Sequence, residues 1–314
     1  MQDYALLIGV DVAKAEVVIC GTPGRLRLTI ENRKTAVARW LKTLPPGTAI
    51  AMESTGAYHL LLATLARAAG MRVYILNPKL VWFAARGQGR RAKTDRIDAE
   101  VVRDYLRDNI ERLHLWSPGT PLQSEIERLL RRRHTLDKHQ TATAMSLSGI
   151  GGLAAEVKKL VDAFQAMLDA IDIRVQLLLE QDEQMRQKQL LLETVVSVGP
   201  VASASMTCVF ARIPFSRSDS VIAFAGLDPR AKDSGKKRGE RHITKNGPAH
   251  LRRTIWLCGF SACHSKLFKP HYQALRARGA STTEAIMILG RKILRIAWAI
   301  WVSNQPFDPA RYQS

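Results

Sequence analysis

The order of β-rich and helical runs in the first hundred residues restricts the fold most strongly. Three β-rich runs come first: YALLIGV, EVVIC and RLRLTI, at residues 4–10, 16–20 and 25–30. Helical and β-rich runs then alternate, at residues 34–43, 48–52, 58–69, 72–76 and about 94–107. The order βββαβαβα predicts a mixed sheet covered by helices, so this part of the chain is expected to be an α/β domain.

Residues 124–185 have a different pattern. Leu, Ile and Val recur at helical spacing among charged residues, and the SGIGG stretch at 148–152 is the break between two long helical runs. This pattern predicts a helical hairpin or coiled-coil arm. A solvated helix pair that spaces two domains and a dimerisation element both fit it equally well.

The charge of the chain indicates its class of partner. It holds 47 Lys and Arg against 28 Asp and Glu, a net charge of +19, which is typical of a protein that binds nucleic acid; a membrane surface is the weaker alternative. Residues 1–110 hold 17 basic and 10 acidic residues, 111–185 hold 9 and 11, and 186–314 hold 21 and 7. We therefore expect two nucleic-acid-facing parts joined by a near-neutral spacer.

The apolar segments and the cysteines argue against a membrane or secreted protein. The most apolar late segment, at 286–302, is interrupted by Arg291, Lys292 and Arg295, which favours a buried helix over a membrane span. The run at 4–10 is followed at once by charged residues, unlike a signal peptide. The four cysteines form no CxxC pair, which predicts reduced thiols and no zinc site. We expect a cytoplasmic protein with no membrane partner.

Four acidic residues lie where strands end and a helix begins. Asp11 follows the first β-rich run in GVDVAK and Glu53 ends the fourth in AMESTG, while Asp95 and Asp98 share one helical face in KTDRIDAE. Such carboxylates would repel one another unless they held hard cations. Oxygen-ligated Mg²⁺ would meet this need and would also serve phosphodiester chemistry.

Each acid also has a purely structural interpretation. Asp95 would stabilise a helix N-terminus, and Asp98 would pair with a nearby arginine. Asp11 would be a turn residue and Glu53 a surface acid. Taken one at a time these interpretations are favoured, but four acids at consistent positions favour a metal site.

The loop at 228–247 is the most basic stretch of the C-terminal part. It contains seven Lys or Arg residues, and Ile243 is its one large aliphatic side chain, so we expect it outside the core. The candidate nucleic-acid contacts are Lys232, Lys236, Lys237, Arg238, Arg241 and Lys245 here, and Arg90, Arg91 and Lys93 in the first part. RRRH at 131–134 is a further candidate; a solvated charge run is the nearly equal alternative.

The motifs together resemble one family. GVDVAK, ESTGAYH, ILNPK and KTDRIDA, in this order, are similar to the DEDD transposases of insertion-sequence family 110, relatives of the Piv and MooV DNA invertases. TVVSVGPVAS, AFAGLDPRAKDSG and KNGPAHLRR resemble the family's C-terminal part. One departure is Val198-Gly199-Pro200, where many members carry a P-G-[IV]-G turn, which puts backbone phosphate binding there in question.

The resemblance implies three regions. Residues 1–110 would be a RuvC-like, RNase H-fold domain with Asp11, Glu53, Asp95 and Asp98 as ligands of Mg²⁺, for which Mn²⁺ would substitute. Residues 111–185 would be the helical coiled-coil arm. Residues 186–314 would be a mainly helical transposase domain with Ser234 as nucleophile, although Ser234-Gly235 taken alone reads as a flexible turn.

The resemblance also implies the activity. The chain would be an insertion-sequence recombinase that cuts and rejoins donor and target DNA through a covalent phosphoserine, directed by an element-encoded guide RNA. A homodimer would assemble into a homotetramer during synapsis, on the nucleoid of a bacterial cytoplasm. The alternatives are an invertase that uses no guide RNA and a RuvC-like endonuclease that uses water.

Overall fold

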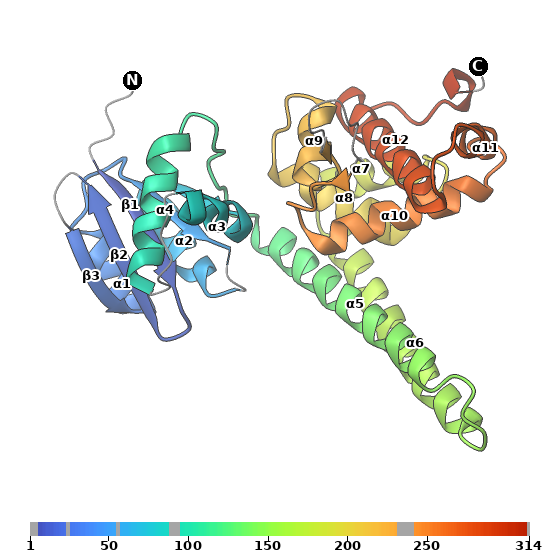
Figure 1. Cartoon of the computed structure of the whole chain (residues 1–314), viewed down its shortest axis with the longest axis horizontal. Coiled ribbons are helices and arrows are strands. Elements are labelled where there is room, and N and C mark those ends of the chain that lie inside the picture. Colours follow the sequence, from blue (N-terminus) through green and yellow to red (C-terminus); the bar gives the residue numbers. More distant parts are fainter. Residues whose placement is uncertain (1–5, 23–25, 55–56, 88–94, 231–241, 313–314) are drawn as a thin grey trace. The chain divides into compact units, whose positions relative to one another are not determined.

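The computed structural model describes residues 6–22, 26–54, 57–87, 95–230 and 242–312, with the backbone alone for residues 95–97, 230 and 312. The chain divides into two compact units, Met1–Pro118 and Gly119–Ser314 (Figure 1). The first unit contains a mixed sheet with helices on both faces. The second is almost entirely helical where it is described.

The first unit contains a five-stranded sheet. Its strands are β1 (Leu7–Val12), β2 (Glu16–Thr22), β3 (Leu26–Glu31), β4 (Ala49–Glu53) and β5 (Arg72–Leu76). Their order across the sheet is β3-β2-β1-β4-β5; β1, β4 and β5 are parallel, and β2 is antiparallel to both of its neighbours. The predicted mixed sheet and its five strands are confirmed.

Helices cover both faces of this sheet (Figure 1). They are α1 (Lys34–Leu41), α2 (His59–Ala68), α3 (Pro78–Gly87) and α4 (Asp95–Asn109). One core cluster joins Val10 and Met52 of the strands to α1 and α2. A second joins Ala51 of β4 to α3 and α4. Successive residues of each strand therefore point into opposite layers.

Helix α3 is the element that the sequence pattern missed. Pro78 begins it directly after β5, and proline suits a first helical position because its missing N–H would have no intrahelical acceptor. Val81 is its buried residue, while Trp82 and Phe83 are each about half exposed. Large apolar residues of α3 therefore lie at exposed as well as buried positions, so the sequence does not show the apolar spacing that is typical of a buried helix face.

The second unit begins with a long helical hairpin. Helices α5 (Pro121–Ser146) and α6 (Ala154–Leu179) pack side by side, as predicted, and two glycines in the connecting turn adopt positive φ (Figure 1). A capping box at Thr120 and Gln123 begins α5. The hydrophobic cluster of the hairpin is concentrated at its base, where it includes Ala204 and Cys208. We call this hairpin the arm.

The remaining helices form the C-terminal core. They are α7 (Glu183–Glu193), α8 (Pro200–Arg212), α9 (Ser218–Phe224), α10 (Ala249–His264), α11 (Lys269–Ala277) and α12 (Thr282–Ser303), followed by a 3₁₀ turn (Pro309–Tyr312). Helix α12 is buried along one face against α10, so the expected buried helix at 286–302 is confirmed. No helix in the described part of the chain combines the length and the apolar character needed to cross a bilayer.

Candidate catalytic site

The parallel strands bring two of the predicted acids to one edge of the sheet. Asp11 is the penultimate residue of β1, and Glu53 is the last residue of β4. The two strands pair in parallel through Val10 and Met52, so one further step in register places Asp11 beside Glu53. Both lie at the carboxyl ends of their strands, where open α/β sheets bind ligands.

The two side chains also point to the same face. Val10 and Met52 are fully buried in the cluster that faces α1 and α2. Because side chains alternate along a strand, Asp11 and Glu53 point to the opposite face, which α3 and α4 cover. Both are partly exposed, and both take part in polar or electrostatic contacts.

Helix α4 lies over β1 at very short range, and Gly9 makes this approach possible. A Cβ atom at Gly9 would lie 2.2 Å from the carbonyl oxygen of Ala99 and 2.2 Å from the amide nitrogen of Arg103. Asp98 directly precedes Ala99, and Gly9 lies two residues before Asp11. The glycine therefore holds the first turns of α4, with Asp98, against the half of β1 that carries Asp11.

Polar contacts fix α4 across the neighbouring strands. Arg103 donates from Nη1 to the sulfur of Cys20 on β2 at 3.1 Å. Glu100 accepts from Arg27 on β3 at 2.7 Å. Burial raises the pKa of the Cys20 thiol, so this sulfur stays protonated at neutral pH. These contacts hold the acidic end of α4 in one position on the sheet.

The structure therefore brings Asp11 and Glu53 to one face of one sheet edge, and Asp98 belongs to the helix that covers this face. Asp95 is the first residue of α4, but its side chain lies outside the described set. Among the described side chains, no group of three or more His, Cys, Asp or Glu residues is close enough to hold a metal ion. Carboxylate oxygens are nevertheless the donors that Mg²⁺ prefers. The four-acid metal site stays a prediction.

The predicted nucleophile and most predicted nucleic-acid contacts lie outside the described residues. These are Ser234, Lys232, Lys236, Lys237, Arg238 and Arg241, together with Arg90, Arg91 and Lys93. Lys245 is described: it is exposed and has a left-handed φ of 56°. Its roles in binding, and those of the residues outside the described set, stay predictions.

The two ends of the predicted catalytic loop are held together on the C-terminal core. Strands β6 (Pro229–Arg230) and β7 (His242–Ile243) form an antiparallel pair. Next to them, the hydroxyl of Thr244 donates to the Asp228 carboxylate. A Cβ atom at Gly247 would lie 2.0 Å from the carbonyl oxygen of Phe224, so the chain after β7 packs directly on the end of α9. The sequence predicted no strands here.

The arginines of the basic run RRRH, at residues 131–134 of α5, differ in their contacts. Arg133 makes two bonds to the Asp172 carboxylate of α6, at 2.5 and 2.8 Å, and Arg131 lies 3.5 Å from Glu127. The guanidinium of Arg133 is therefore occupied within the hairpin. Arg131 and Arg132 are exposed and remain candidate nucleic-acid contacts.

One candidate contact surface was missed by sequence reasoning. On α3, Trp82 and Phe83 lie edge to face with ring centroids 5.0 Å apart, and the guanidinium of Arg86 lies 4.3 Å from the Trp82 ring. Exposed aromatic rings beside arginine are typical of surfaces on which nucleobases stack. Helix α3 begins at the carboxyl end of β5, beside the strand that ends at Glu53. The adjacent Trp82-Phe83 pair, shortly before the basic stretch at residues 86–93, was the available signal.

Two family models match this chain. The DEDD transposase model of the IS110 family matches residues 8–150, and a second model, described as a transposase of the IS116/IS110/IS902 family, matches residues 189–273. The chain belongs to the IS110 family of transposases. The predicted family is therefore confirmed, and with it a DNA transposase or recombinase activity.

Relatives of this IS110-family transposase have two kinds of name. The pilin gene-inverting protein of Moraxella lacunata is 24% identical over 265 residues, which cover 82% of this chain and 81% of the relative. The insertion element IS116 protein of Streptomyces clavuligerus is 26% identical over 164 residues, which cover 48% and 39% of the two chains. The chain is thus similar both to gene-inverting proteins and to insertion-element proteins.

Proposed function

We propose that this transposase cuts and rejoins DNA through a covalent phosphoserine on Ser234, with Asp11, Glu53, Asp95 and Asp98 as the metal-binding acids. The observation that supports it most is the meeting of Asp11 and Glu53 on adjacent parallel strands, facing the helix that begins with Asp95. The strand order supports the RuvC-like, RNase H fold that the family resemblance implies.

The proposed chemistry balances without an energy source. The Ser234 hydroxyl oxygen attacks phosphorus, the bond from phosphorus to the 3′ oxygen breaks, and the proton passes to that oxygen, giving a 3′-hydroxyl. Mg²⁺, when bound by the carboxylates, would offset negative charge on the phosphate and the leaving oxygen. Rejoining reverses these steps with a new 3′-hydroxyl, so ATP is not required.

The proposed substrates are donor and target DNA, selected by an element-encoded guide RNA. The net charge of +19 suits binding through phosphates, and the Trp82, Phe83 and Arg86 surface suits stacking on unpaired bases. We further propose a homodimer that assembles into a homotetramer in synapsis.

The decisive test is a protein–DNA adduct on a denaturing gel. Cleavage of element-end DNA is expected to leave an adduct that survives boiling, and Ser234→Ala is expected to abolish it. Ser216→Ala, an exposed serine of the same unit, is the matched control and should keep it. Unchanged cleavage by Ser234→Ala would instead support a nuclease that uses water.

The acids are tested separately. Asp11→Asn and Asp98→Asn are expected to abolish Mg²⁺-dependent cleavage, and chelation by EDTA should have the same effect on the unchanged protein. Retained activity in both variants, without metal dependence, would contradict the metal site. It would favour a nucleic-acid-binding protein with no catalytic role for this sheet edge.

A second candidate is an invertase that acts without guide RNA. The extended similarity to pilin gene-inverting proteins favours it. Both candidates have the same residues and chemistry, so RNA that copurifies with active protein distinguishes them. A discrete RNA that matches DNA beside the gene supports guidance, whereas RNA-free protein that recombines DNA supports the invertase.

A further inference from the structure

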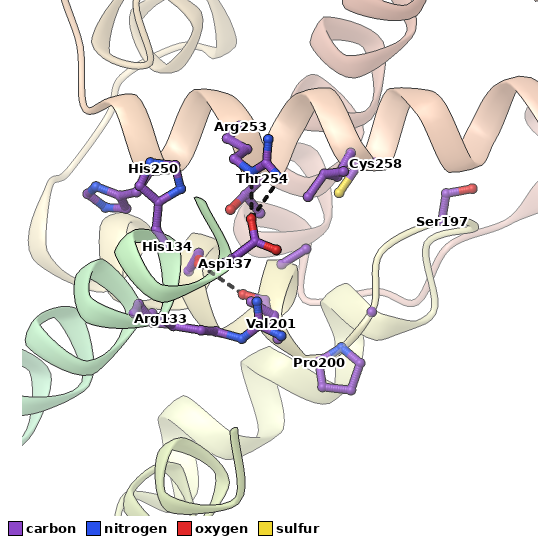
Figure 2. A pocket seen from close by; sticks show the side chains of 15 residues that line it. Arg133, His134, Asp137, Ser197, Pro200, Val201, His250, Arg253, Thr254 and Cys258 are labelled. Atoms are coloured by element: carbon purple, nitrogen blue, oxygen red, sulfur yellow. Dashed lines mark hydrogen bonds and ion pairs between the residues drawn. The ribbon is translucent and has the colours of Figure 1, made fainter. Parts of the chain in front are cut away.

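A pocket lies where the base of the arm meets α8 and α10 (Figure 2). Its volume is about 290 Å³. Most of its polar lining comes from three helices that lie far apart in the sequence: His134 and Asp137 of α5, Ser205 of α8, and His250, Arg253 and Thr254 of α10. None of these residues has a role in the proposed strand cleavage.

The charges around this pocket are largely balanced by ion pairs. Arg253 lies 2.7 Å from the Asp137 carboxylate, and Figure 2 shows the pair across the pocket. Arg133, also in the lining, is paired with Asp172 outside it. A phosphate would have to compete with these carboxylates for the two guanidinium groups. The pocket therefore favours a ligand without formal charge.

The two histidines of the pocket are neutral near pH 7. Burial, followed by the nearby Arg131, lowers the pKa of His250 to about 4. Burial and Arg253 also lower the pKa of His134. A neutral imidazole offers one hydrogen-bond donor and one acceptor, not a positive charge.

The rest of the lining is apolar. Leu130, Val201, Ala202, Leu257 and Cys258 contribute to it. Burial raises the pKa of the Cys258 thiol to about 12, so this sulfur also carries no charge. Apolar walls with a few donors and acceptors suit a planar, neutral, hydrogen-bonding molecule. A nucleobase has this chemistry.

An exposed aromatic surface continues from the pocket along α10. Leu257, in the pocket lining, and Phe260, one turn further on, are each 44% exposed. The Phe260 ring stacks on Trp256 with an interplanar angle of 13° and a centroid distance of 5.5 Å, and His264 lies edge-on to it. Aromatic faces of this kind bind successive bases of a single strand.

We propose that this pocket binds one nucleobase that is unstacked from a single strand of nucleic acid, while neighbouring bases stack on the aromatic face of α10. The inference rests on the proposed function in one respect: the protein must bind nucleic acid. It depends neither on Ser234 nor on the metal.

The test separates contacts to bases from contacts to phosphates. Fluorescence anisotropy would measure the Kd of the full-length protein for an oligo-dT strand about 12 nucleotides long and for an abasic strand of equal length and charge. We expect oligo-dT to bind about tenfold more tightly, because the abasic strand offers no ring to the pocket.

Filling the pocket provides the second half of the test. Thr254→Phe is expected to weaken oligo-dT binding by about tenfold and to leave the abasic strand unaffected. Ala211→Phe, an exposed position at the far end of α8, is the matched control and should alter neither affinity. Equal losses for both strands in Thr254→Phe would show a phosphate site and overturn the proposal, as would no loss for either strand.

Two additions keep the result clear. His250→Ala removes a polar partner without adding bulk, and it is also expected to lower the preference for bases. It replaces Thr254→Phe in the test if that variant misfolds, and circular dichroism melting checks the fold of each variant. Repeating the series with oligo-U identifies whether RNA or DNA enters the pocket, and no base preference with either strand contradicts the inference. A protein that binds no strand contradicts the proposed function itself, whereas equal affinity for oligo-dT and the abasic strand contradicts base binding by the pocket and by the aromatic surfaces but leaves the proposed cleavage chemistry intact.

Discussion

The imidazole of His250 is largely buried, with several basic side chains nearby. Besides burial, Arg131, His134, Arg212 and Arg252 disfavour its protonated form, and together they lower its pKa from 6.5 to about 4. The unfolded chain therefore takes up this proton before the folded chain does as the pH falls. This single side chain links the stability of the second unit to pH.

We predict the effect of removing it. The stabilising effect of neutral His250 is complete above about pH 6.5, is lost progressively toward pH 4, and is worth roughly 3 kcal/mol at most. In urea unfolding, His250→Gln should therefore lose less stability between pH 7 and pH 4 than the unchanged protein. His139→Gln, an exposed histidine of α5, is the control and should retain the native pH dependence.

Sequence reasoning located the acids of the sheet edge but not the pocket. Asp11 and Glu53 could be found because strand ends are visible in the sequence and parallel strands bring their carboxyl ends together. The pocket joins Asp137 to Arg253, 116 positions apart. No local pattern records such a meeting, because it depends on how three helices pack.

At the scale of elements, the contact between α4 and β1 positions the predicted metal site. The two backbones approach so closely at Gly9 that any side chain there would force them apart. The strands and helices of this unit followed from periodicity, but this close approach did not. A glycine within a strand shows only that the position leaves room for another backbone.

Gly9→Ala should therefore remove activity without changing any acid. The new methyl group meets two backbone atoms at 2.2 Å, which cannot rotate away, so we expect a loss of about 3 kcal/mol or more of folding stability and loss of DNA cleavage. Gly21→Ala in β2 is the matched control, because its methyl group would meet the Leu26 side chain at 3.2 Å. Urea unfolding and the cleavage assay measure both effects; near-native stability in Gly9→Ala would refute the close packing.

The arm offers a comparison of two ion pairs. Arg133 and Asp172 join α5 to α6 through two bonds and are about three-quarters buried, whereas Lys158 and Asp162 lie one turn apart on the exposed surface of α6. Asp172→Asn should lower the free energy of unfolding by about 1–3 kcal/mol. Asp162→Asn should change it by less than about 0.5 kcal/mol. Similar losses in chemical denaturation would contradict the role given to the buried pair.

At the scale of the whole chain, the boundary between the units lies after Pro118. The sequence predicted a change of region after residue 110, where the last helix of the α/β part ends. Trp116 lies beyond that helix: its amide donates to the carbonyl of Val73 on β5 at 2.8 Å, and its ring packs on the sheet core. Charge and periodicity do not reveal such a return of the chain.

Two fragments test this boundary. Residues 1–118 contain both clusters of the sheet and should unfold cooperatively. Residues 1–110 lack Leu113 and Trp116, which pack on those clusters, and should be less stable by about 2–3 kcal/mol. Urea unfolding followed by circular dichroism compares them. Equal midpoints would mean that the segment after α4 adds nothing to this unit.

The length of the arm has a mechanical consequence. Helix α5 lines the pocket at its junction with α8 and α10 from Leu130 onward and ends at Ser146, so it spans about 24 Å from this junction to the turn at its far end. A tilt of about 5° at that junction would displace the far end by about 2 Å. Because α5 and α10 both line the pocket at this junction, a ligand bound there that tilts α5 would move the far turn of the hairpin.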